Sequence, residues 1–198
     1  DSDTDSDTDS DSDTDTDTDS DTDIEACLSM ADDMDGGVAA DGGTAEPLDF
    51  VPFINEFHYD NASDDVGEFV EIAAPACFDF TGWQIAYYNG SDGAVYATTD
   101  LFGLASNTGS GVGFKVDYPA TPIQNGAPDG FALVDDSGSV VEFLSYEGTV
   151  TATDGPATAA TSVDVGVEEG SSTIAVLSIQ RQVKRLAAAD FAWATGLD

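Results

Sequence analysis

From Pro47 onward, short runs of β-forming residues alternate with clusters of turn residues, and this pattern limits the globular part of the chain to an all-β fold. Two of the turn clusters, at 90–93 (GSDG) and 135–138 (DDSG), are strong hairpin signals. The spacing between turns is typical of a β-sandwich. The pattern predicts strands at 50–59, 68–73, 83–89, 94–98, 113–116, 130–134, 140–145, 174–182 and 191–193.

The first 23 residues cannot take part in that fold. Every odd position from Asp1 to Asp23 is Asp, and every even position is Ser or Thr. A tract without apolar side chains has nothing to bury against the entropy of ordering, so we expect a disordered, self-repelling spacer. Residues 24–46 are rich in Gly, Ala and acid and predict a linker with one helical turn at 27–30. The domain itself is expected at 47–198, with a short helical turn at 183–189.

The charge of the chain restricts its partners. The 198 residues include 40 acidic and 4 basic ones, for a formal net charge of −36. This balance argues against direct nucleic-acid binding, because such affinity comes mostly from Lys and Arg at phosphates. It favours calcium, a high-salt setting or a partner with basic patches. Three of the four basic residues, Arg181, Lys184 and Arg185, cluster late in the chain, which indicates charge balancing within the domain or, alternatively, a binding patch.

The two cysteines, Cys27 and Cys77, are distant in sequence and lack metal-ligand spacing. In an exported protein the simplest prediction is a disulfide that attaches the segment after the tail to the domain, the alternative being two unpaired thiols. No stretch of about 18 apolar residues is present, so no transmembrane segment is predicted. The chain begins abruptly and without a signal peptide, as a mature or excised fragment would.

No catalytic constellation is evident in the sequence. His58 is the only histidine, and no Ser lies in a nucleophile-elbow context. Metal-dependent nuclease chemistry usually needs several His or Asp ligands, which one His does not supply. We therefore predict that the chain is not an enzyme and that His58 has a structural role.

A metal site is a better candidate. Oxygen-bearing side chains converge on the loop after the first predicted strand, namely Asp60, Asn61, Asp64, Asp65 and Glu68. Calcium takes six to eight oxygen ligands, which such a loop can provide with backbone carbonyls and water. The alternative is a polar turn in which Asp and Asn cap their own backbone.

Aromatic side chains form the second candidate binding surface. Tyr87 and Tyr88 are neighbours on one predicted strand and therefore point to opposite faces. At most one of them is expected in the core, and the outward one would stack on a sugar or on a partner side chain. The alternative is a plain cross-strand pair. Trp83 and Trp193 are expected in the core.

Several short motifs follow one another in a specific order, namely 54–61 (INEFHYDN), 64–72 (DDVGEFVEI), 79–85 (DFTGWQI), 88–90 (YNG), 123–134 (IQNGAPDGFALV), 143–148 (FLSYEG), 152–156 (ATDGP), 164–167 (DVGV) and 190–193 (DFAW). In this order they resemble the lamin tail domain, in its bacterial branch. The resemblance implies an immunoglobulin-like β-sandwich. It also implies a tethering or binding module of a secreted or cell-surface protein, carried beside nucleases, phosphoesterases or other hydrolases.

The expected function is therefore a non-catalytic binding or tethering module, with calcium as a candidate stabilising ion. Its partner would be a protein, a polysaccharide or another surface component. Two alternatives remain open: a structural subunit of an extracellular layer or fibre, in which an open strand edge joins neighbours, or the accessory domain of a secreted nuclease or phosphoesterase whose catalytic domain lies elsewhere in the full-length chain.

Overall fold

The computed structural model describes Cys27 and residues 49–62, 66–170, 172–174, 177–183 and 191–197. The acidic tract 1–23 lies outside the described residues, as do the predicted linker apart from Cys27, which is helical, and the predicted helical turn apart from Val183. Val183 is the last residue of a strand.

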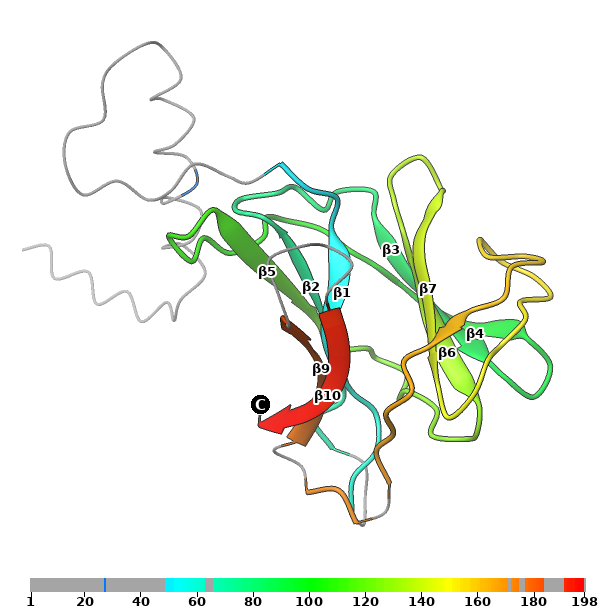
Figure 1. The fold of residues 1–198 in the computed structure, drawn as a ribbon. Helices are drawn as coiled ribbons and strands as arrows, with labels where there is room; N and C mark the ends of the chain where they lie inside the picture. The colour runs from blue at the N-terminus through cyan, green and yellow to red at the C-terminus, as the bar shows by residue number, and fades with distance from the viewer. Residues whose placement is uncertain are drawn as a thin grey trace, which may run out of the picture.

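The described chain folds into two five-stranded sheets (Figure 1). Sheet I has the order β10-β9-β1-β2-β5 and sheet II the order β4-β3-β6-β7-β8. The strands are β1 (Phe53–His58), β2 (Phe69–Pro75), β3 (Gln84–Asn89), β4 (Ala94–Asp100), β5 (Val112–Asp117), β6 (Asp129–Val134), β7 (Val140–Tyr146), β8 (Val163–Asp164), β9 (Leu177–Val183) and β10 (Phe191–Leu197). The prediction of an all-β fold is confirmed.

Each of the nine predicted strands has a counterpart at the predicted place. Neighbours in both sheets pair antiparallel except at one edge. There the two-residue strand β8 runs parallel to β7, with Leu144 opposite Val163. β8 was not predicted, because two exposed residues carry no periodic pattern.

The main core lies between the two sheets and is rich in aromatic side chains. Phe57 of β1 makes edge-to-face contacts with Phe131 of β6 and Trp193 of β10, at centroid distances of 5.0 and 5.5 Å. Trp83 is buried and Trp193 half-buried in this cluster, in agreement with their predicted core positions. Burial of such large rings is the dominant favourable contribution to the sandwich.

A second apolar cluster covers the outer face of sheet II. It comprises Ala86, Tyr88, Ala132, Val134, Phe143, Val150, Ala152 and Ala157. The last three belong to the connection between β7 and β8, so this connection packs over the sheet. As a result every residue of β6 is buried. Its successive side chains do not alternate between the core and solvent, because both faces of the strand are covered.

Arg181 links the two sheets at one end of the sandwich. Its guanidinium lies over the rings of Phe53 and Trp193, 5.0 and 4.8 Å from their centroids. The same group pairs with Glu142 of β7 (2.5 Å), whose other oxygen accepts the backbone N–H of Ile54. Charge balancing, the first of the two predicted roles, therefore describes Arg181; Lys184 and Arg185 lie outside the described residues.

Candidate functional site

The predicted calcium ligands lie on the loop after β1, namely Asp60, Asn61, Asp64, Asp65 and Glu68. Asp64 and Asp65 are outside the described residues. Asn61 is buried and donates a hydrogen bond to the carbonyl of Val66 (2.9 Å), while Glu68 accepts one from the backbone N–H of Ile123 (2.8 Å). Within the part of the chain that the structure describes, no group of three or more His, Cys, Asp or Glu side chains is placed to hold a metal ion. The calcium site stays a prediction.

The carboxylate that organises this loop is Glu169, a buried residue of the segment between β8 and β9. One of its oxygens lies 2.8 Å from Nδ1 of His58, and the other accepts the backbone N–H groups of Tyr59 (2.7 Å) and Asp60 (3.0 Å). The hydroxyl of Tyr59 accepts the backbone N–H of Glu169 in return and donates to Glu147. These bonds join the end of β1 to a segment about 110 residues later in the chain.

Sequence reasoning missed Glu169. It is one of two adjacent Glu residues in a chain with 40 acidic residues, so nothing in its local sequence distinguishes it. The one signal available in the sequence was His58. A buried His needs a hydrogen-bond partner, and in so acidic a chain that partner is expected to be a carboxylate.

His58 has both ring nitrogens occupied. Besides the contact of Nδ1 with Glu169, Nε2 lies 2.9 Å from the side-chain nitrogen of Asn61, and the residue is only 1% exposed. The hydrogen bond to the Glu169 carboxylate raises the pKa of His58, against the opposing effect of burial. The ring therefore does not reach solvent, and its geometry supports the structural role predicted for it.

The expectation of one outward-facing tyrosine at the β3 strand is wrong. Tyr87 and Tyr88 do point to opposite faces, but Tyr87 is 1% exposed in the main core and Tyr88 is fully buried in the second cluster. The hydroxyl of Tyr88 accepts the backbone N–H of Ala157 (2.9 Å), on the connection that covers sheet II. Neither ring forms a stacking surface, because the connection between β7 and β8 covers the face of the sheet that the sequence pattern predicted to be exposed.

Tyr87 instead supports a buried carboxylate. Its hydroxyl donates to Asp117 at the end of β5 (2.8 Å), which joins sheet II to sheet I through the core. Burial raises the pKa of Asp117, and the hydrogen bond from Tyr87 partly offsets that effect. Burial and the Asp117 charge also hold the pKa of Tyr87 far above its usual range.

Two open clefts lie on the surface of the described chain. The first, of about 370 Å³, is lined mainly by polar residues from the β3–β4 turn and the stretch before β6, namely Asn89, Ser91, Gln124, Asn125, Gly126, Ala127 and Asp129. The second, of about 510 Å³, is lined by Glu147, Gly148, Asp164, Gly166, Val167 and Glu168. The first cleft contains a buried carboxylate, Asp129, whereas the second is lined by three acidic residues, Glu147, Asp164 and Glu168.

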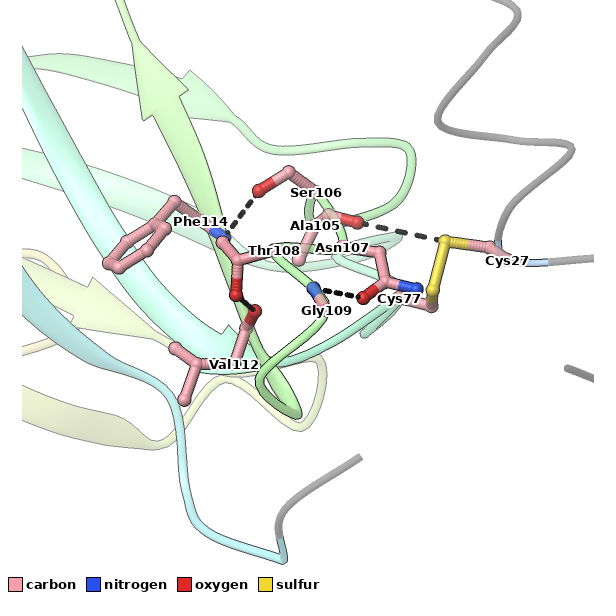
Figure 2. Close-up of a disulfide and its surroundings, with 9 residues drawn as sticks. All are labelled: Cys27, Cys77, Ala105, Ser106, Asn107, Thr108, Gly109, Val112 and Phe114. Carbon is pink, nitrogen blue, oxygen red and sulfur yellow. Dashed lines mark hydrogen bonds between the residues drawn. A yellow bond between two sulfur atoms is a disulfide. The ribbon is translucent and has the colours of Figure 1, made fainter. Parts of the chain in front are cut away.

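Cys27 and Cys77 form a disulfide with a Cα–Cα distance of 5.4 Å, the pair that the sequence analysis named (Figure 2). Cys77 lies two residues after the end of β2, and its backbone N–H donates to the carbonyl of Ser106. The sulfur of Cys27 lies 4.0 Å from the carbonyl oxygen of Ala105. The disulfide thus docks against the loop that leads into β5, and it closes a covalent loop with a sequence separation of 50.

Figure 2 also shows why this loop offers a firm attachment point. Ser106 and Phe114 exchange two hydrogen bonds, one through the Ser106 hydroxyl and one through its backbone N–H, each 2.9 Å long. Thr108 donates to the carbonyl of Val112 (2.6 Å), and Asn107 accepts the backbone N–H of Gly109 (2.9 Å). The turn beneath the disulfide is therefore closed by its own side chains.

Comparisons of the chain with protein-family models, with curated proteins and with solved structures found no match. Among the described residues, no helix has the length and apolar character needed to cross a membrane.

Proposed function

We propose that this chain is a non-catalytic tethering or binding module of a secreted or surface protein, built on an immunoglobulin-like sandwich of the lamin-tail type. The observation that carries the proposal is the disulfide between Cys27 and Cys77. It joins the sequence that follows the acidic tract covalently to the body of the sandwich.

The order of strand pairing supports the immunoglobulin-like part of the proposal. When β1 to β7 are lettered A, B, C, C′, E, F and G, sheet I contains the neighbours A-B-E and sheet II the neighbours C′-C-F-G. Immunoglobulin-type domains pair A, B and E in one sheet and C, F and G in the other, and variable-type domains place C′ beside C. β9 and β10 extend sheet I beside A, and β8 extends sheet II beside G.

The disulfide supports the extracellular part of the proposal, because disulfides form and persist mainly in oxidising compartments. The net charge of −36 supports a partner with basic groups, since complementary charge steers association. A protein, a polysaccharide or another surface component can supply such groups.

The tethering role follows from where the disulfide enters the fold. A load on the acidic tract reaches Cys27, passes through the disulfide and enters the sandwich at Cys77. β1 and β2 both lie inside the covalent loop, so the load does not pull on them in series. These two strands are inner strands of sheet I, where each pairs with a neighbour on both sides.

Force spectroscopy on the full chain, held by its first and last residues, tests this role. The oxidised protein is expected to unfold at a higher force than the Cys27→Ala/Cys77→Ala variant, in which the load enters at the start of β1. Urea unfolding of both proteins serves as the control, because it measures the stability difference without a direction of load.

Equal unfolding forces for the two proteins would remove the mechanical role of the disulfide and, with it, the tethering proposal. Turnover of a generic ester or phosphodiester by the purified chain would contradict its non-catalytic part.

A further inference from the structure

The chain contains two Asn-Gly pairs, Asn89-Gly90 and Asn125-Gly126, and the asparagines of both pairs line the first cleft. Asn followed by Gly is the pair most prone to spontaneous deamidation, because Gly has no side chain to hinder ring closure. The backbone nitrogen of Gly attacks Cγ of Asn, its proton and the side-chain amide leave as ammonia, and water opens the succinimide to Asp or isoaspartate.

The fold requires glycine after Asn89. A Cβ at position 90 would lie 1.7 Å from the carbonyl oxygen of Pro128, which is a backbone atom and cannot move aside. The asparagine also has a structural task, since its side-chain oxygen accepts the backbone N–H of Ser91 (2.8 Å) and shapes the β3–β4 turn. The labile pair is therefore a consequence of the turn itself.

Solvent exclusion does not protect these pairs. Asn125 and Gly126 are exposed, and Asn89 and Gly90 are half-buried at the rim of the cleft of about 370 Å³. Water needed to open a succinimide is therefore available at both sites.

One buried carboxylate contacts the reactive nitrogen of both pairs. Asp129, 3% exposed at the start of β6, accepts the backbone N–H of Gly90 at 2.8 Å. Its carboxylate also lies against Gly126, where an added Cβ would be 3.1 Å from Oδ2 of Asp129, and a hydrogen bond from the Gly126 backbone counters the rise that burial causes in the pKa of Asp129. The two nitrogens that would act as nucleophiles are thus the two that this side chain holds.

We propose that Asn89 and Asn125 are latent deamidation sites and that Asp129 keeps both unreactive by holding the N–H groups of Gly90 and Gly126. A hydrogen bond to a carboxylate stabilises the protonated amide nitrogen, whereas ring closure needs its proton to be lost. The same bond fixes the peptide plane. At Asn89 the extended backbone of β3 already directs the Gly90 nitrogen away from the side chain, and the bond to Asp129 prevents the rotation that would bring it back.

The experiment compares the wild-type chain with the Asp129→Ser variant during incubation at mildly alkaline pH. Peptide mapping by mass spectrometry measures deamidation at each Asn separately. The variant loses a hydrogen bond to a charged group, which stabilises the unreacted amide. The deamidation rate at Asn89 and at Asn125 is therefore expected to rise about tenfold in the folded variant. Ser is preferred to Asn at position 129, because Asn there would create a third Asn-Gly pair with Gly130.

Asp135→Ser is the matched control. Asp135 also accepts two backbone N–H groups, those of Ser137 and Ser139, but it contacts no Asn-Gly pair. The control is expected to leave both deamidation rates at the wild-type value. A folded Asp129→Ser variant with an unchanged rate at either site would overturn the shared role of Asp129.

Hydrogen exchange on the wild-type chain provides a test that needs no variant to fold. The N–H groups of Gly90 and Gly126 are expected to exchange more slowly than that of Gly109, which donates to the neutral side chain of Asn107 in an exposed turn. Exchange of Gly90 and Gly126 as fast as that of Gly109 would also overturn the proposal.

Discussion

At the scale of single residues, buried polar groups find partners that lie far away in the chain. His58 pairs with Glu169, and Tyr87 with Asp117. Burial of a polar or charged group costs free energy unless a hydrogen bond replaces water, so each partner is needed once the other is buried. These pairs tie separate strands together and make single substitutions informative.

The first prediction concerns His58→Gln. The pKa of His58 is raised in the folded protein, so the stability it contributes is fully present below its unfolded pKa of about 6.5 and is lost as pH rises through the folded pKa. Below about pH 6.5 the variant is expected to be less stable than the wild type by about 3 kcal/mol, because the buried Glu169 carboxylate loses its charged partner and keeps only neutral donors such as the N–H groups of Tyr59 and Asp60. The difference in unfolding free energy between the wild type and the variant, here called the gap, should narrow as pH rises.

Urea unfolding at a series of pH values measures this gap. Burial also raises the pKa values of Asp117 and Asp129, and their contribution likewise falls as pH rises, so the difference between the two proteins is the quantity to follow. A gap that stays constant from pH 5 to pH 9 would contradict a charged His58–Glu169 pair.

The second prediction concerns Tyr87→Phe. Loss of the hydroxyl leaves the buried Asp117 without one of its donors, which is expected to cost about 2 kcal/mol of unfolding free energy. Tyr118→Phe is the matched control, because Tyr118 is 72% exposed and its hydroxyl is accessible to water. Thermal unfolding of both variants checks the prediction, and equal melting temperatures would show that the Tyr87 hydroxyl is not needed.

The amino-acid sequence was sufficient to predict the structural roles of some residues and not of others. A disulfide between Cys27 and Cys77 was predictable, because the chain has only two cysteines. The role of Glu169 was not, since tertiary folding selects one carboxylate among many. The alternation rule assigned one of Tyr87 and Tyr88 to solvent, because it cannot register that residues 150–157 fold back over the sheet.

At the scale of elements, turn residues and β-forming runs predicted most strands, because hairpin signals are local. β8 escaped prediction because it owes its pairing to its place beside β7 rather than to its own residues. The sequence pattern also could not predict which turns lie close together in space. Gly90 meets Pro128 only because β3 and β6 are neighbours in sheet II.

That approach gives a third prediction. Gly90→Ala is expected to destabilise the protein by about 3 kcal/mol or more, because the added Cβ would overlap the carbonyl oxygen of Pro128. Gly170→Ala is the control, since a Cβ there has no atom within 4 Å and the backbone is not left-handed. Urea unfolding that finds the two variants equally stable would contradict the close packing of the turn.

The fourth prediction concerns the link between the sheets. Arg181→Gln removes the ion pair with Glu142 and the stacking on two aromatic rings, and it is expected to cost about 2 kcal/mol. Lys115→Gln removes the same charge from a residue whose ammonium group lies over the exposed ring of Phe102, and a cost below about 0.5 kcal/mol is expected. If chemical denaturation finds similar losses of unfolding free energy for the two variants, the effect of Arg181 comes from its charge alone and not from its specific contacts.

At the scale of the whole molecule, an all-β sandwich was predictable from the spacing of turns, and the described structure confirms it. The pairing order of two sheets was not, because it depends on crossovers that no local signal encodes. In the tethering role that we propose, the disulfide carries a load on the acidic tract into the sandwich at Cys77.

The most direct test of this account is the contour length of the fully unfolded chain, pulled from its first and last residues with and without reductant. With the disulfide intact, the sequence between Cys27 and Cys77, a separation of 50 residues, cannot extend. At about 3.5 Å per residue, the oxidised chain is predicted to be about 170 Å shorter than the reduced one. The same length in both conditions would contradict a load path through the disulfide.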